Sequence, residues 1–358
     1  MEFTPDDRIG SYRVETELGP AGAGLLIQAR HLVLPRRAII KVVHAAFATI
    51  APYVLQTLRE ACILEAIAHP GVPIVYESGV LRDRRPWFAF ELIAGPTLDE
   101  LLAQGQVPVI EVAGLVRDLA EILEHAHRRG VIHCGLRPDR IVLTAERRYP
   151  LCIPDWSESI AHDAAHMPRA APDGSRSYLA PELADPGTDE HPVIDDRTDM
   201  FALGVIAYRA LTGELPFALG DGAAPAIPAS ELRPDAPPEL AAIIDALLAF
   251  DRFDRPSAAE VRADLDWLFE ALAELRPRAA SSRESALSIA RGARAGAGGS
   301  PADLGSSPPG AGAPPEDVVL LEQPRLRRPR WTPEIRYLET TQVERKIAEK
   351  ISEDDRTK

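Results

Sequence analysis

The feature that most constrains the fold of this chain is a change of hydrophobic pattern near residue 95. Before that point, short segments rich in β-branched and aromatic residues are bounded by glycine, proline or charged turns, which is typical of strands. The predicted strands are residues 11–18, 25–32, 37–43, 71–81 and 86–93. One helix is predicted among them, over residues 53–68, because its apolar residues recur at near-helical spacing.

Beyond Gly95 and Pro96, the apolar residues of the longer segments follow helical spacing instead. The predicted helices are residues 97–105, 109–130, 199–213, 238–250 and 257–275. A loop-rich region that ends near Glu182 separates the second of these helices from the third. A small β-rich part followed by a larger helical part predicts an α+β fold with two lobes, and a cleft between lobes is the expected binding site.

The composition changes again near residue 278, where alanine, glycine, proline and serine dominate. Such a segment cannot bury enough apolar surface to offset the entropy of ordering it, so a disordered linker is predicted. Further on, Val343, Ile347 and Ile351 form a narrow apolar stripe at helical spacing. The predicted parts are an N-terminal extension (1–9), a main domain (10–277) with lobes 10–94 and 95–277, the linker with a basic end (278–330), and a tail (331–358) with a short amphipathic helix (341–353).

Charge and cysteine content narrow the range of functions. The formal net charge of −14 argues against binding to nucleic acid, which needs a basic surface. The three cysteines are widely spaced and form neither a disulfide framework nor a zinc pattern. The first ten residues lack a signal-peptide pattern, and the apolar run 200–208 is far shorter than the roughly 20 residues that cross a bilayer. We therefore expect a cytoplasmic protein that binds neither nucleic acid nor membrane, and whose partners are other proteins.

One stretch points to a chemistry. "GVIHCGLRPDRIVLT", residues 130–144, resembles the loop on which protein kinases carry their catalytic aspartate. Other motifs of that family follow the same order along the chain: "ELGPAGAGLLIQARH", "AIIK", "LREA", "WFAFELIAG", "PDWSES", "GSRSYLAPE", "DMFALG" and "DRFDRPSAAEV". From about Gly10 to Leu275 the sequence resembles the bacterial serine/threonine protein kinase family. The resemblance implies a two-lobed kinase fold with a small β-rich N-lobe and a large helical C-lobe.

The resemblance also assigns roles to single residues. ATP is the implied ligand, and the nucleotide-binding positions are Gly19, Gly22, Gly24, Lys41, Glu60, Glu91, Ile93 and Asp155. Asp155 matches the metal-binding aspartate, and it would hold Mg²⁺ only if that ion is bound at all. The implied structural residues are His133, Glu182, Asp199 and Arg255, with Glu182 and Arg255 as a buried ion pair.

The catalytic loop departs from the family pattern at its chemical positions. When H-R-D-L-K-P-E-N is laid on "HCGLRPDR", Gly135 falls on the catalytic base and Arg140 on the metal-binding asparagine. Glycine cannot accept a proton, and an arginine would repel Mg²⁺. Asp139 is the nearest acid, but the resemblance places it facing away from the substrate hydroxyl. No catalytic residue is therefore assigned, and a catalytically degenerate member, a pseudokinase, is predicted.

The signals for nucleotide binding conflict. Lys41, Glu60 and Asp155 are retained, but Ile39 stands where the family has a small alanine beneath the adenine, and overpacking of this kind costs about 1–3 kcal/mol. Arg137 and Arg140 offer another route, because guanidinium groups could contact phosphates without Mg²⁺.

Three functions are weighed. The first is a pseudokinase that regulates or scaffolds a protein partner in bacterial signalling and binds ATP without efficient phosphotransfer. The second is an atypical but active serine/threonine kinase that transfers the γ-phosphate of ATP to protein. A small-molecule phosphotransferase is disfavoured, because "GSRSYLAPE" resembles the peptide platform of protein kinases.

Overall fold

The computed structural model describes residues 2–145, 147–161, 176–184, 194–217 and 226–274. The chain divides into two compact units, residues 1–300 and residues 301–358, and all the described residues belong to the first unit. The predicted linker 278–330 and the predicted tail helix 341–353 therefore lie outside the described residues. Among the described helices, none combines the length and the apolar character needed to span a bilayer.

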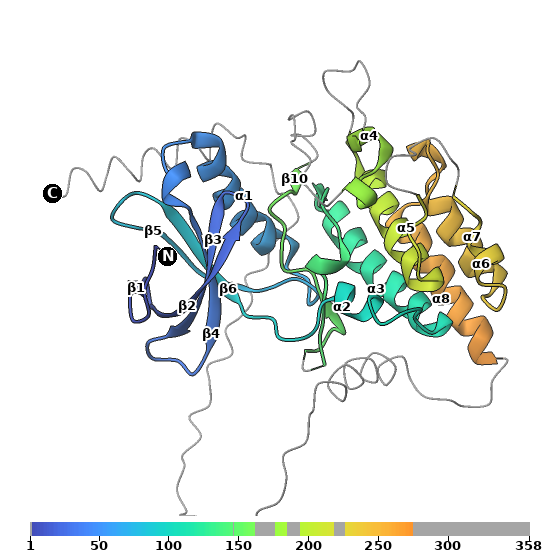
Figure 1. Cartoon of the computed structure of the whole chain (residues 1–358), viewed down its shortest axis with the longest axis horizontal. Helices are drawn as coiled ribbons and strands as arrows, with labels where there is room; N and C mark the ends of the chain where they lie inside the picture. The colour runs from blue at the N-terminus through green and yellow to red at the C-terminus, as the bar shows by residue number, and fades with distance from the viewer. Residues whose placement is uncertain (1, 146, 162–175, 185–193, 218–225, 275–358) are drawn as a thin grey trace, which may run out of the picture. The chain divides into compact units, whose positions relative to one another are not determined.

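The N-terminal part is an antiparallel six-stranded sheet with the strand order β1-β2-β3-β4-β6-β5 (Figure 1). Its strands are β1 (Arg8–Ile9), β2 (Tyr12–Ala21), β3 (Gly24–His31), β4 (Arg37–Val43), β5 (Val75–Val80) and β6 (Pro86–Glu91). Helix α1 (Ala51–Ile67) packs against β4, β5 and β6. The helix has proline in its first turn and ends where Ala68 adopts a left-handed conformation. The strands and the helix predicted for this part are present, and the first nine residues add β1 to the sheet.

The C-terminal part is helical. It contains α2 (Leu98–Leu102), α3 (Val109–His127), α4 (Pro181–Ala184), α5 (Asp196–Thr212), α6 (Ala229–Leu232), α7 (Pro238–Leu247) and α8 (Ala258–Glu274). Helix α5 is buried along most of its length and contacts α3 and α7. The side chain of Asp195 caps its N-terminus, and Gly213 ends it with a φ of 84° that favours glycine. The predicted two-lobed α+β fold is confirmed.

Two short strand pairs hold the loops that follow α3, over residues 131–161. Strand β7 (Val131–Ile132) pairs with β10 (Ile160–Ala161), and β8 (Val142–Leu143) pairs with β9 (Leu151–Cys152). Between β7 and β8 the chain makes a single 3₁₀ turn, η2 (Pro138–Arg140). These pairings bring the loop 133–140 and the segment 153–159 alongside each other.

Both faces of the sheet are buried where β4 crosses it. Ala38, Ile40 and Val42 face one apolar cluster, whose buried members all lie on strands of the sheet. Ile39, on the opposite face, joins the large cluster that continues through α3 and α5. Alternation along β4 therefore explains why a single strand contributes to two cores.

Candidate nucleotide site

A buried ion pair joins the sheet to its helix. Lys41 lies on β4 and Glu60 on α1, and their Nζ and Oε2 atoms are 2.7 Å apart. Gly24 on β3 leaves room for the lysine, because a Cβ at that position would come within 3.1 Å of Lys41 Cε. Burial raises the pKa of Glu60, and the lysine ammonium opposes that shift. The pair expected from the sequence is present.

Asp155 lies between two cations just after β9. Its Oδ1 is 3.9 Å from Lys41 Nζ, and its Oδ2 is 3.2 Å from Arg140 Nε. Burial alone would disfavour the carboxylate, but Lys41 and Arg140 outweigh it and lower the pKa of Asp155 to about 2. Asp155 is therefore ionised at neutral pH, with its charge already shared between a lysine and an arginine.

Arg140 reaches a second carboxylate, which the sequence analysis did not identify. Its Nη1 lies 2.7 Å from Oε1 of Glu158, three residues beyond Asp155. The Arg140 guanidinium thus bridges Asp155 and Glu158, and all three side chains are largely shielded from solvent. In the sequence, the only sign of this contact is that Glu158 lies three residues after Asp155. Whether its side chain points toward Arg140 depends on the backbone conformation of the segment.

Glu158 also fills the space above Gly135. A Cβ on Gly135 would lie 2.6 Å from Glu158 Oε2 and 3.1 Å from Arg140 Nη1. Atoms at the first of these distances would clash, so any larger residue at 135 requires Glu158 to move. Gly135 and Arg140, the two departures noted in the sequence, are therefore linked in space through a third residue.

The catalytic loop itself is held from below as expected. The carboxylate of Asp199, in the first turn of α5, accepts hydrogen bonds from the backbone N–H groups of His133 and Cys134, each at 2.7 Å. His127 Nε2 lies 2.9 Å from the same carboxylate, a partner that the sequence analysis missed. Burial opposes ionisation of Asp199, but the bond to His127 lowers its pKa. These bonds support Cys134 in a left-handed conformation, with φ at 60°.

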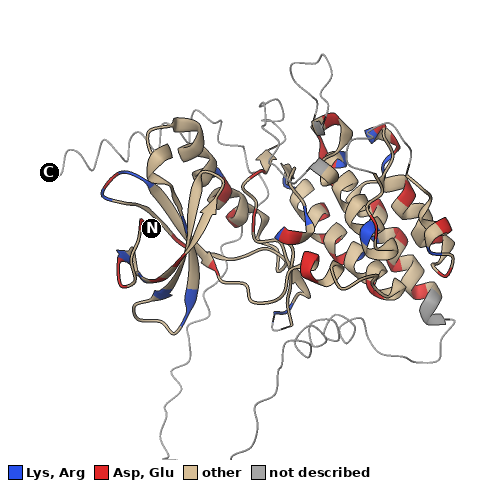
Figure 2. Cartoon of the chain, viewed as in Figure 1, with Lys and Arg blue, Asp and Glu red and all other residues tan. Residues whose placement is uncertain are grey.

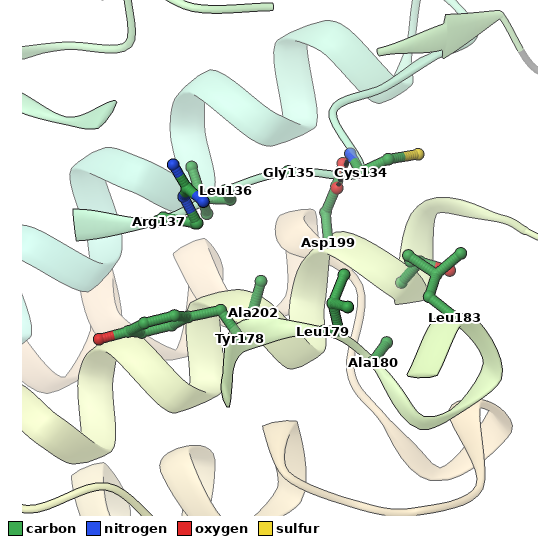
Figure 3. A pocket seen from close by; sticks show the side chains of 11 residues that line it. Cys134, Gly135, Leu136, Arg137, Tyr178, Leu179, Ala180, Leu183, Asp199 and Ala202 are labelled. Atoms are coloured by element: carbon green, nitrogen blue, oxygen red, sulfur yellow. Dashed lines mark hydrogen bonds between the residues drawn. The ribbon is translucent and has the colours of Figure 1, made fainter. Parts of the chain in front are cut away.

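The two arginines expected to meet phosphates engage different carboxylates. Arg137 donates to Asp139 at 2.9 Å, whereas Arg140 is bound to Asp155 and Glu158. Figure 3 shows Arg137 at the Tyr178 end of a small pocket between the catalytic loop and residues 178–183. Only Arg140 therefore lies beside the lysine and the aspartate of the candidate nucleotide site.

The glycine-rich hairpin forms, with a tight turn. Ala21 pairs with Gly24, so the turn consists of Gly22 and Ala23 alone. Gly22 has a φ of 60° and Gly19 has a φ of 124°, conformations that glycine adopts readily. A side chain at either position would meet open space, so backbone conformation and not crowding requires glycine at Gly19 and Gly22.

The apolar side of the site is well packed. Ile39 and Leu143 belong to the large core cluster, and Leu26 packs against that cluster. Ile39 is only 8% exposed. This burial is consistent with the isoleucine narrowing the slot for an adenine. Glu91 ends β6 and its carboxylate is 3.1 Å from Arg147 Nη1, while Ile93 lies in the connection between β6 and α2.

The predicted buried pair in the helical part is present. Arg255 Nη1 and Nη2 donate to the two carboxylate oxygens of Glu182 at 2.8 and 2.9 Å. Arg255 also donates to the backbone oxygens of Ala249, Arg197 and Phe250. This bidentate pair connects α4 to the turn before α8.

A sheet with a lysine–glutamate pair, followed by an aspartate and an arginine-braced helical part, defines the protein kinase class. Residues 12–267 match the protein kinase domain family, and the chain belongs to that family. Relatives include the serine/threonine-protein kinase PknJ of Mycobacterium tuberculosis, 30% identical over 258 residues, 69% of this chain and 43% of the relative. PknB of Mycolicibacterium smegmatis is 28% identical over 80% of this chain and 47% of the relative.

A solved structure agrees with this assignment. The crystal structure of the Mycobacterium tuberculosis PknI kinase domain is similar with a TM-score of 0.55 and 26% identity, over 75% of this chain and 99% of that domain. The chain spans less than half the length of the PknJ and PknB relatives. Together, the family match and these relatives show a protein kinase domain related to bacterial serine/threonine kinases, a family whose members bind ATP.

Proposed function

We propose that this chain is a pseudokinase: a regulatory or scaffolding module that binds ATP and presents its kinase fold to a protein partner without efficient phosphotransfer. The observation that carries the proposal is the position of Arg140 between Asp155 and Glu158. In the kinase family an asparagine at this position and the aspartate hold Mg²⁺ together. Here a guanidinium has taken the place of the ion beside the aspartate.

The residues around Asp155 do not fit a Mg²⁺ ion in the usual way. A divalent cation would have to displace Arg140 from Asp155 or approach within reach of its positive charge, and both are unfavourable. Phosphate groups would instead meet two side-chain cations, Lys41 and Arg140, which would exchange part of their present carboxylate contacts for phosphate oxygens. Guanidinium groups form paired hydrogen bonds with phosphate oxygens, so this arrangement supports nucleotide binding that does not depend on a metal.

Thermal unfolding with ATP tests this proposal. At an ATP concentration about a hundredfold above Kd, binding adds about 2.7 kcal/mol, which is expected to raise Tm by roughly 5–10 °C. We expect the same rise in EDTA and in Mg²⁺ buffer. Arg140→Gln is expected to lose most of the rise in EDTA, because one of the two phosphate-facing cations is removed.

Arg128→Gln is the matched control for this titration. Arg128 lies after α3 and pairs with Glu124, and its side chain is 62% exposed. This variant is expected to show the wild-type rise in both buffers. A rise that needs Mg²⁺, or no rise in either buffer, would contradict metal-independent binding.

The second candidate, an atypical active kinase, has one specific observation in its favour. The carboxylate of Glu158 occupies the space that a side chain at Gly135 would fill, so it could accept the substrate proton. Its contact with Arg140 weakens this hypothesis, because the guanidinium already holds the Glu158 carboxylate at 2.7 Å.

Transfer of labelled phosphate from ATP distinguishes the two functions. The pseudokinase predicts no incorporation above that of Lys41→Met. An active enzyme that uses Glu158 as its base predicts measurable incorporation, which Glu158→Gln would lower by about 10²–10⁴-fold. Glu65→Gln, at an exposed position of α1, is the control for the change of charge. Incorporation that depends on both Lys41 and Glu158, and not on Glu65, would replace our proposal with the second one.

A further inference from the structure

Four arginines form a row across the first four strands of the sheet. Arg8 pairs with Arg13, Arg13 pairs with Arg30, and Arg30 pairs with Arg37, each directly opposite the next. Directly opposed residues of antiparallel strands point to the same face, so all four side chains share one face of the sheet. Neighbouring strands are about 4.8 Å apart, which makes the row roughly 14 Å long. We call these four residues the arginine row; Figure 2 shows basic residues on these strands.

The arginine row is open to solvent. The side chains of Arg13, Arg30 and Arg37 are 59%, 60% and 51% exposed, and Arg8 is exposed as well. Neighbours of the row along the strands, among them Ile9, Tyr12, Ala29 and Ala38, are buried on the opposite face. The alternation of the strands therefore places the four guanidinium groups on the same face of the sheet as Ile39 and Lys41, at the end of that face that is open to solvent.

The arginine row is expected to destabilise the sheet, and its positive charge is opposite in sign to the net charge of the chain. Like charges directly opposite one another destabilise a sheet, and the row contains three such pairs in succession. The repulsion is offset in part. Glu15 lies 3.1 Å from Arg30 and 2.9 Å from Arg37, and Asp6 lies 3.5 Å from Arg13. Two carboxylates against four arginines leave a positive surface on a chain with a net charge of −14.

We propose that the arginine row binds an acidic peptide segment of a protein partner. Guanidinium groups form paired hydrogen bonds with carboxylates, and a row of roughly 14 Å matches about four residues of an extended peptide, at about 3.4 Å each. Binding of such a peptide does not depend on whether the nucleotide site transfers phosphate.

Two other anionic partners fit the row less well. A nucleic acid would meet four cations on a chain whose net charge of −14 repels it. A membrane would bring its anionic surface against Glu15, which lies among the arginines on the same face of the sheet. A short acidic peptide can place its carboxylates on the arginines and avoid Glu15.

Fluorescence anisotropy with the full chain tests the inference. The probe is a labelled twelve-residue peptide with glutamate at every second position, titrated at low and at physiological salt. In Arg13→Gln/Arg30→Gln, two partners of the peptide are lost, and we expect affinity to fall by about tenfold, with a shallower dependence on salt. Because the substitutions also remove like-charge repulsion, we expect Tm to stay the same or to rise.

The control variant is Arg82→Gln/Arg84→Gln, which removes the same charge from exposed positions between β5 and β6. Its affinity for the peptide is expected to stay within twofold of wild type. Equal losses in the two double variants would mean that the peptide senses only net charge, and would overturn the inference. So would absence of binding to the peptide, or tighter binding to phosphatidylserine vesicles or to duplex DNA.

Discussion

Arg255→Met is expected to lower the free energy of unfolding by about 3–5 kcal/mol, because it leaves buried polar groups without a partner. The arginine side chain is fully buried, and it binds both oxygens of Glu182 as well as three backbone carbonyls. Methionine has a similar length but cannot donate to any of these acceptors. Urea unfolding followed by circular dichroism measures the change.

Arg252→Met is the control for this prediction. Arg252 is three residues away, its side chain is 20% exposed, and its ion pair with Asp195 is long, at 3.5 Å. We expect a loss of about 1 kcal/mol or less from this variant. In Arg255→Met/Glu182→Gln, part of the stability should return, because the carboxylate left without its partner is gone. If Arg255→Met costs no more than Arg252→Met, the buried pair does not brace the helical part.

The fold was predictable because its signals are local and repeated. Short β-branched and aromatic segments bounded by turns before residue 95, and helical spacing after it, are sufficient for the two parts. The pairing of Lys41 with Glu60 followed from the resemblance to kinases, and so did the pairing of Glu182 with Arg255, 73 residues further along the chain. Both pairs are found in the structure, because the backbone that positions them is that of the family.

The rearranged part of the site was less predictable. The sequence shows that Gly135 and Arg140 are unusual, but Glu158 links them only through its side-chain direction, which no local pattern encodes. The arginine row has the same property. Its members are scattered between residues 8 and 37, and they line up only once the register of the strands is known.

Because Glu158 lies against both Gly135 and Arg140, restoring kinase chemistry requires a change at Glu158 as well. Gly135→Asp alone is expected to lower Tm and to leave transfer absent, because its Cβ would lie 2.6 Å from Oε2 of Glu158. Gly135→Asp/Arg140→Asn restores the family residues but removes the cation that holds Glu158. The triple variant Gly135→Asp/Arg140→Asn/Glu158→Ala provides the base, the metal-binding amide and the space for both.

We therefore expect the triple variant to transfer labelled phosphate from ATP in Mg²⁺ at about 10²–10⁴ times the rate of the wild type, the usual contribution of a general base. The single and double variants should fall below it, and Lys41→Met in the triple background should abolish the gain. Thermal shift with ATP and Mg²⁺ shows whether the triple variant binds the nucleotide. If it binds but does not transfer, Gly135, Arg140 and Glu158 are not the block, and the bulk of Ile39 against the adenine becomes the next explanation.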